Sequence, residues 1–171
     1  MSSSPNPERS EAVSHPSVDR VRAHLTTAGA DPASVAGLRI LPDAVATAAA
    51  AAAALDVEVG QIANSLVFDA DGVPLLVLTS GAHRVDTVKV AALVGANRVR
   101  RASPEFVYAA TGQRIGGVAP VGHPEPLRTL VDRALEGYPR IWAAGGIPHA
   151  VFPTTFAELL RVTRGTPADV A

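Results

Sequence analysis

The sequence predicts a single α/β domain of the α+β type, in which helices pack on a mixed sheet. Its 171 residues are the size of one ordinary domain. Hydrophobic residues make up 47% of the chain and charged residues 18%, which is enough apolar surface for most of the chain to fold. Helix start and stop signals alternate with short apolar runs typical of strands.

The N-terminal part of the chain predicts a leader and two helices. Residues 1–16 combine prolines with Ser, Asn and Glu, so we expect a disordered leader. The domain should begin at Ser17, which is suited to cap a helix that stops at Gly29. A second helix is expected over 46–55, where a run of alanines gives a small, flat face for close packing.

A hairpin is the clearest element of the sequence. Two apolar runs, 65–68 and 75–80, flank the turn 69–72, which ends in Asp-Gly. Because both runs are almost continuously apolar, we expect both faces of the hairpin to be covered. A helix then follows Asp86 as its cap and stops at Gly95.

The densest basic stretch is 97–101, Asn-Arg-Val-Arg-Arg. It reads as a short strand, and two interpretations of its charge stay open. It is either a solvated edge strand that charge protects from aggregation, or a patch that contacts phosphate.

The C-terminal half predicts two more helices and three strands. Ser103 and Pro104 begin a helix that ends at Gly112. A capping box at Thr155 begins the last helix. We expect a loop at 115–126, strands at 127–131, 141–144 and 150–152, a domain covering 17–165, and a tail at 166–171.

Composition excludes several classes of protein. The absence of cysteine excludes disulfide scaffolds, cysteine nucleophiles and thiolate zinc sites. The beginning of the chain has no apolar run typical of a signal peptide, and no stretch of 18 apolar residues could cross a bilayer, so we expect a cytoplasmic protein without a membrane partner. The net charge of −1 does not favour a dedicated duplex binder.

Two glycine-rich loops are the candidates for chemistry. Residues 115–126 contain three glycines, three prolines and His123, and the N–H groups of Gly116 and Gly117 could hold a carbonyl oxygen as it gains negative charge. A plain turn would need the same glycines. Residues 143–149 follow a predicted strand and end in His149, so the two loops could line one pocket. The five histidines show no pair at ligand spacing, and we predict neither a metal nor a cofactor.

Several segments together resemble the YbaK/EbsC family, the free-standing relatives of the editing domain of prolyl-tRNA synthetase. The resemblance runs in order from about Val18 to Val162 and is carried by Gln61-Ile-Ala-Asn-Ser-Leu-Val-Phe68, Thr79-Ser-Gly81, Arg84-Val-Asp86, Gly116-Gly-Val-Ala-Pro-Val-Gly-His-Pro124 and Gly145-Gly-Ile-Pro-His-Ala-Val-Phe152.

The resemblance implies a mostly antiparallel sheet curled into a barrel-like core. It also implies trans-editing, the hydrolysis of a wrong amino acid, alanine or cysteine, from proline tRNA. The expected partners are the tRNA acceptor end and an aminoacyl-tRNA synthetase. The implied catalytic residues are Asn64, Gly116 and Gly117, and the implied substrate-binding residues are Ser65, Ser80, Gly81, Val118, Pro120, His123, Gly145 and His149.

The family usually has lysine where this chain has Asn64. A carboxamide still donates hydrogen bonds, but it carries no charge to pair with phosphate or an oxyanion. Two function classes therefore remain open: a deacylase, and a non-catalytic module that binds an aminoacyl or nucleotide group. A hydrolase of small esters or amides is a weaker third.

Overall fold

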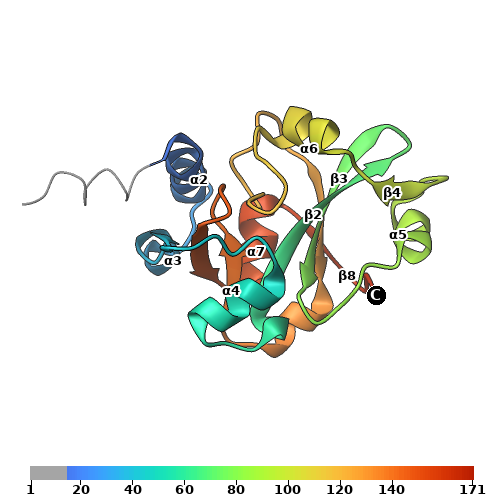
Figure 1. Ribbon diagram of the computed structural model, residues 1–171. Coiled ribbons are helices and arrows are strands. Elements are labelled where there is room, and N and C mark those ends of the chain that lie inside the picture. Colours follow the sequence, from blue (N-terminus) through green and yellow to red (C-terminus); the bar gives the residue numbers. More distant parts are fainter. Residues whose placement is uncertain (1–14) are drawn as a thin grey trace, which may run out of the picture.

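The computed structural model describes residues 15–171, which form one eight-stranded mixed sheet with helices on both faces (Figure 1). The helices are α2 (Pro16–Thr27), α3 (Pro32–Ala36), α4 (Ala48–Leu55), α5 (Thr87–Val94), α6 (Pro104–Thr111), α7 (Phe156–Thr163) and the 3₁₀ turns η1 (Val59–Gln61) and η2 (Arg133–Gly137). The strands are β1 (Arg39–Ile40), β2 (Ile62–Ala70), β3 (Val73–Ser80), β4 (Val99–Arg101), β5 (Arg128–Asp132), β6 (Ile141–Ala144), β7 (Ala150–Thr154) and β8 (Thr166–Ala168).

The order of strands confirms the predicted mixed sheet. It runs β1-β7-β6-β2-β3-β5-β8, and β4 pairs with β2 beside this path. The pairs β1–β7, β2–β3, β2–β4 and β6–β7 are antiparallel, whereas β2–β6, β3–β5 and β5–β8 are parallel. Since β1 and β8 lie at the two ends of the path, closure of the sheet into a barrel stays a prediction.

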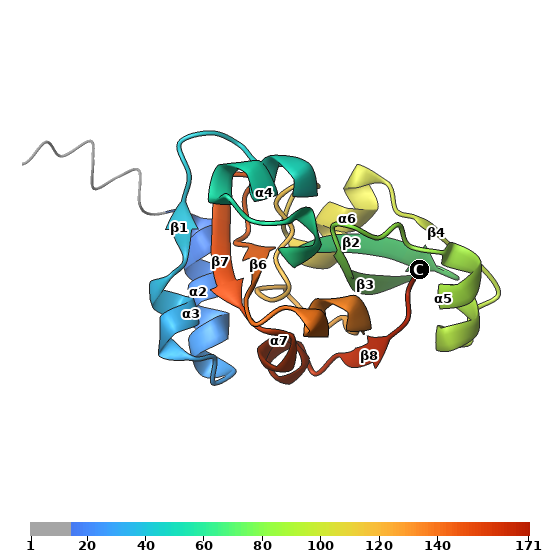
Figure 2. The same cartoon turned by 90° about the horizontal axis from the view of Figure 1, so that it is seen from below.

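Different helices cover the two faces of the sheet. Apolar residues of α2, α6 and α7 share one core with alternate residues of β2 and β3. On the other face, α4 covers β6 and β7, and α5 covers the far ends of β2 and β3. Figure 2 shows α4 and α5 apart from each other, with α5 at the end of the molecule opposite α2 and α3. The middle of β2 therefore lies between these two helices.

Local signals place most elements where the sequence predicts them. The hairpin turns at Asp71 and Gly72, which have φ of 53° and 87°, the left-handed pair of a type I′ turn. Asp86 caps α5 by accepting hydrogen bonds from the N–H groups of Val88 and Lys89. Ser103 caps α6 in the same way, through the N–H of Phe106.

Two expectations at the ends of elements need correction. His15, not Ser17, caps α2, because Pro16 is the first helical residue and lacks an N–H; the His15 ring accepts from the N–H of Ser17. The expected tail, 166–171, contains β8 and the fully buried Val170, so it belongs to the sheet. Of the expected leader, residues 1–14 lie outside the described part of the chain.

The capping box at Thr155 forms only in part. The Thr155 hydroxyl accepts from the N–H of Glu158, as predicted. The Glu158 carboxylate is buried and instead accepts from the Ser34 and Thr154 hydroxyls and the Asp31 N–H, at 2.6, 2.7 and 2.7 Å. It therefore connects α7 to α3 and β7 rather than closing its own helix.

Candidate functional site

The candidate site lies at a gap along one edge of β2. On the edge opposite β3, β2 pairs with β6 through 62–63 and with β4 through 68–70. Residues 64–67 therefore have no strand partner on this edge among the described residues. An open edge presents backbone groups that a ligand can bind, and ligands commonly bind where neighbouring strands diverge.

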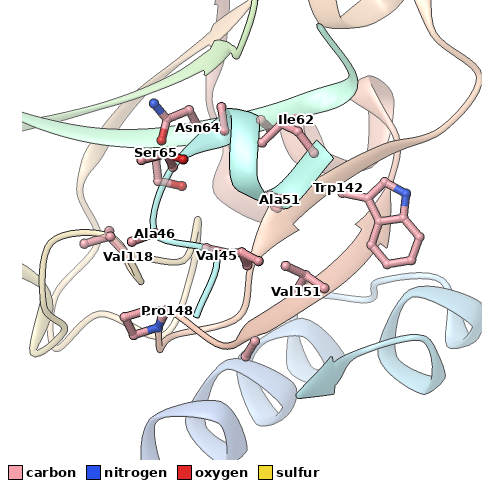
Figure 3. A pocket seen from close by; sticks show the side chains of 17 residues that line it. Val45, Ala46, Ala51, Ile62, Asn64, Ser65, Val118, Trp142, Pro148 and Val151 are labelled. Atoms are coloured by element: carbon pink, nitrogen blue, oxygen red, sulfur yellow. The ribbon is translucent and has the colours of Figure 1, made fainter. Parts of the chain in front are cut away.

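Two adjoining cavities open at this gap. The inner cavity has a volume of about 40 Å³ and is bounded by β2, β6, α4 and the segments that precede α4 and β7. The outer cavity, of about 250 Å³, follows residues 64–68 toward β4 and α6. Figure 3 shows Asn64 and Ser65 at one side of the inner cavity and Trp142 at the opposite side. Both cavities are lined by Ala46, Thr47, Ala48, Asn64, Ser65, Gly116 and Val118.

Small residues at the start of α4 form the wall shared by the two cavities. The Thr47 hydroxyl caps α4 by accepting from the N–H of Ala50 at 3.1 Å. Gly116 comes so close to this wall that a Cβ on it would lie 3.1 Å from the Cβ of Ala46. Ala46, just before the alanine run, therefore limits the width of the site at Gly116, and Ala48 and Ala51 of the run line the inner cavity.

Ser65 and Asn64 are the polar side chains of β2 at the site. The Ser65 hydroxyl oxygen is buried, and it is without a hydrogen-bond partner among the described residues. A buried polar atom in this state is expected to find its partner in water or a ligand. Asn64 is half-buried and lines both cavities.

The two glycine-rich loops meet at Gly117, which confirms that they lie together. A Cβ on Gly117 would lie 2.5 Å from the carbonyl carbon of Ile147 and 2.6 Å from the nitrogen of Pro148. The N–H of Gly117 donates to the carbonyl of Arg114 at 3.0 Å. The N–H of Gly117 is therefore engaged in a turn and its Cα is packed against the second loop, while its predicted role as a donor to substrate stays a prediction.

His123 and Pro120 lie in a different place from the predicted one. They line a separate cavity of about 480 Å³ beside α2 and α7, and not the two cavities at the gap. The His123 ring donates to the carbonyl of Ala119 at 2.8 Å, while the N–H of Ala119 donates to Gln113. Burial lowers the pKa of His123; the nearby His24 lowers it further, and the Ala119 carbonyl opposes this effect. His123 therefore holds the shape of the loop.

Four other residues predicted to bind substrate lie outside the lining of the two cavities and make contacts within the fold. The Ser80 hydroxyl is buried and donates to the carbonyl of Gly60. A Cβ on Gly81 would lie 2.5 Å from the Val59 oxygen, and one on Gly145 would lie 2.9 Å from the Cβ of Ala150. The His149 ring lies 3.4 Å from the Leu41 carbonyl oxygen and lines neither cavity at the gap.

Of the eleven residues predicted for the site, the structure brings four to the gap: Asn64, Ser65, Gly116 and Val118. Ala143, Ala144 and Pro148, from the predicted loop 143–149, also line the inner cavity. The other residues of its lining were not predicted, and they are mostly apolar: Val45, Ala46, Thr47, Ala48, Ala51, Ile62, Ala63, Trp142, Ala150 and Val151. No chemical motif marks such residues. The one available signal was the small face of the alanine run.

Within residues 15–171, no group of three or more His, Asp or Glu side chains is arranged to hold a metal ion. Over the same range, the helices lack the length and apolar character needed to span a bilayer. At the gap, the polar side chains of Thr47, Asn64 and Ser65 lie among mostly apolar residues around a small cavity.

The fold and the gap define an α/β domain that can receive a small group at an open sheet edge. A family model described as "Aminoacyl-tRNA editing domain" matches residues 42–162, and the chain belongs to this family. It is 45% identical to a solved structure described as "Crystal structure of a putative trans-editing enzyme for prolyl tRNA synthetase", with a TM-score of 0.82 over 92% of this chain and 98% of that one. A second solved structure, of hypothetical protein APE2540, is 30% identical, with a TM-score of 0.79 over 88% of this chain and 98% of that one.

Curated relatives extend the similarity to synthetases. Proline–tRNA ligase of Nitratidesulfovibrio vulgaris (strain DP4) is 34% identical over 117 residues, which are 68% of this chain and 20% of the ligase. Proline–tRNA ligase of Geobacillus kaustophilus (strain HTA426) is 31% identical over 134 residues, 71% of this chain and 23% of the ligase. The chain thus spans about one fifth of the length of these relatives. The family model, the solved structures and the curated relatives agree with the resemblance seen in the sequence. The function of the family is tRNA editing.

Proposed function

We propose that this chain is a trans-editing deacylase, which hydrolyses the ester between a wrong amino acid and its tRNA. The observation that carries the proposal is the inner cavity of about 40 Å³ beside the unpartnered Ser65 hydroxyl. Since one water needs roughly 10–15 Å³ of such space, the cavity suits a methyl or thiol side chain better than a branched one. Alanine or cysteine on proline tRNA is therefore the proposed substrate.

Hydrolysis of an aminoacyl ester needs mainly orientation and stabilisation of charge. Water adds to the ester carbonyl, the carbonyl oxygen becomes an oxyanion, and the bond to the ribose oxygen then breaks as that oxygen takes a proton. The proposed donors to the oxyanion are the Asn64 carboxamide, the Ser65 hydroxyl and the Gly116 N–H. The Gly116 N–H has no acceptor among the described residues, unlike that of Gly117. Each such donor contributes about 10²–10³ in rate where it has been removed from other enzymes.

The neutral Asn64 supports a second candidate function. A charge-assisted hydrogen bond is roughly twice as strong as a neutral one, so a carboxamide gives less stabilisation to an oxyanion than an ammonium group. The same pocket could bind an aminoacyl or nucleotide group without hydrolysing it. A hydrolase of small free esters would need only the inner cavity.

Incubation of the purified protein with a panel of mischarged tRNAs and free aminoacyl esters, followed by measurement of released amino acid, tests these functions. We expect release of alanine or cysteine from proline tRNA at least tenfold faster than release of leucine or phenylalanine. Asn64→Lys should raise the rate about tenfold if the cation is the missing contribution. Binding without release by either protein supports the module, and release from free esters alone supports the small-ester hydrolase.

The partners follow from the same proposal. The acceptor end of tRNA is the direct partner, and a prolyl-tRNA synthetase is the proposed source of mischarged tRNA, because the curated relatives are proline–tRNA ligases. Such a substrate would place the protein in the cytoplasm.

A further inference from the structure

Arg101 is the charged residue that lines the outer cavity. It lies at the end of β4, where Arg101 is paired with Phe68 of β2. Residues directly opposite each other in an antiparallel pair share a face of the sheet, and so do residues separated by an even number along a strand. Asn64 is four residues before Phe68, so Asn64 and Arg101 lie on the same face.

The guanidinium of Arg101 is available to a ligand. Its residue is exposed, and it has no acidic partner among the described residues. Its neighbour Arg100 lies on the opposite face and contacts Asp69 at 3.4 Å. Arg114, the other arginine near the outer cavity, stacks on the ring of Tyr108 at 5.3 Å. Arg101 is therefore an uncompensated cation at the mouth of a cavity that is otherwise neutral.

The span along β2 is to be covered by one nucleotide together with the long side chain of Arg101. Four residues of strand separate Asn64 from Phe68, the partner of Arg101, by about 13 Å, at roughly 3.3 Å per residue. Asn64 and Arg101 line the same outer cavity. If the amino acid occupies the inner cavity, the ribose would enter the outer cavity beside residues 64–68, and the phosphate on its 5′ oxygen would come within reach of Arg101, which lines that cavity.

From this placement we infer that Arg101 binds the phosphate on the 5′ side of the nucleotide that carries the amino acid. The inference rests on the proposed function for the identity of the ligand. Arginine is suited to this role because its planar fork binds phosphate oxygens in pairs. A cation on β4 thus gives the site a charge that Asn64 does not.

Equilibrium binding of two RNA hairpins that carry no amino acid tests the inference without hydrolysis. Both copy a tRNA acceptor stem ending in CCA, and one has a neutral methylphosphonate in place of the last phosphodiester. Fluorescence anisotropy gives the affinity of wild type, Arg101→Gln and the matched control Arg100→Gln. We expect Arg101→Gln to weaken binding of the natural hairpin about tenfold and to lower its salt dependence by about 0.7 in log–log slope. The methylphosphonate hairpin should bind wild type and Arg101→Gln within twofold of each other.

Equal losses on both hairpins would show that Arg101 contacts a different phosphate and would overturn the inference, as would no loss on either. A loss of the same size in Arg100→Gln would reduce the effect to general surface charge and also overturn it. Arg101-dependent binding together with no release of amino acid from any tRNA would leave the inference standing and remove the deacylase function. If the wild type releases amino acid and Arg101→Gln does so with the same KM, the deacylase function stands and the inference about Arg101 is overturned.

Discussion

For Asn64 and Ser65 at the gap, the sequence predicted the position of the residues but not the unpartnered state of the Ser65 hydroxyl. The strand run that contains Asn64 and Ser65 predicted their position at the entry to a hairpin, and the structure places both there. The unpartnered state of the Ser65 hydroxyl depends on what the loop at Gly116 and the start of α4 leave open. Those segments are distant in sequence, so no local pattern could predict it.

The glycines of the loop divide into different roles for a physical reason. Gly116 has φ of 91°, a left-handed conformation that favours glycine, and it lines both cavities. Gly117 makes the closest approach to the other loop and uses its N–H in a turn. Adjacent glycines look alike in a sequence, and only packing separates a ligand-facing glycine from one that touches a second backbone.

Gly117→Ala should lower the free energy of unfolding by roughly 1–3 kcal/mol, the usual cost of overpacking. Its Cβ would lie 2.5 Å from the backbone of Ile147, which a side-chain rotation cannot relieve. Urea unfolding followed by circular dichroism measures the change. Gly137→Ala is the matched control, because a Cβ there has nothing within 4 Å and should change stability by less than about 0.5 kcal/mol. Equal stability of the two variants would mean that the loops do not pack as described.

At the scale of elements, caps and turns were predicted best, because their signals are local. Asp86, Ser103 and Thr155 all cap the helices assigned to them, and the hairpin turns where an Asp-Gly pair predicts it. The elements that the sequence did not predict are short: α3, β1, β8 and the 3₁₀ turns. Strands such as β1 and β8 exist because β7 and β5 offer them an edge, which is information outside their own few residues.

Thr47→Ala should affect both the stability of α4 and the site. Loss of its hydrogen bond to the Ala50 N–H should cost about 1 kcal/mol and loosen the wall shared by the two cavities, so we expect a higher KM for aminoacyl-tRNA. Ser103→Ala removes an equivalent cap, from the N–H of Phe106 on α6, and should cost a similar amount of stability. Parallel measurements of unfolding and KM separate the two effects. An equal change of KM in both variants would show that the wall at Thr47 has no special role.

For the whole molecule, the class of fold was predictable and the gap was not. Alternating helix and strand signals suffice for a mixed sheet. The gap arises because two strands pair with different parts of the same edge of β2. β6 pairs in parallel with residues 62–63, and β4 pairs antiparallel with residues 68–70. These pairings join residues far apart in the chain, so their register follows from the packing of the complete sheet. Resemblance to a family supplied the location of the site, which periodicity could not.

The stability of the whole molecule should depend on pH through His123. The pKa of this partly buried ring is lowered from 6.5, so the folded protein resists protonation that the unfolded chain accepts. Above about pH 6.5 the ring is neutral in both states, and its contribution to stability is complete. As pH falls from there toward the lowered pKa, the unfolded state gains a proton first, and the free energy of unfolding should fall by up to about 1.4 kcal/mol per pH unit.

Two variants test this dependence on pH. His123→Gln retains an N–H donor for the Ala119 carbonyl and should reduce the slope of unfolding free energy against pH, while His24→Gln should leave most of that slope. Urea unfolding of the three proteins between pH 8 and 5 makes the comparison, and an unchanged slope in His123→Gln would assign the pH dependence to other groups.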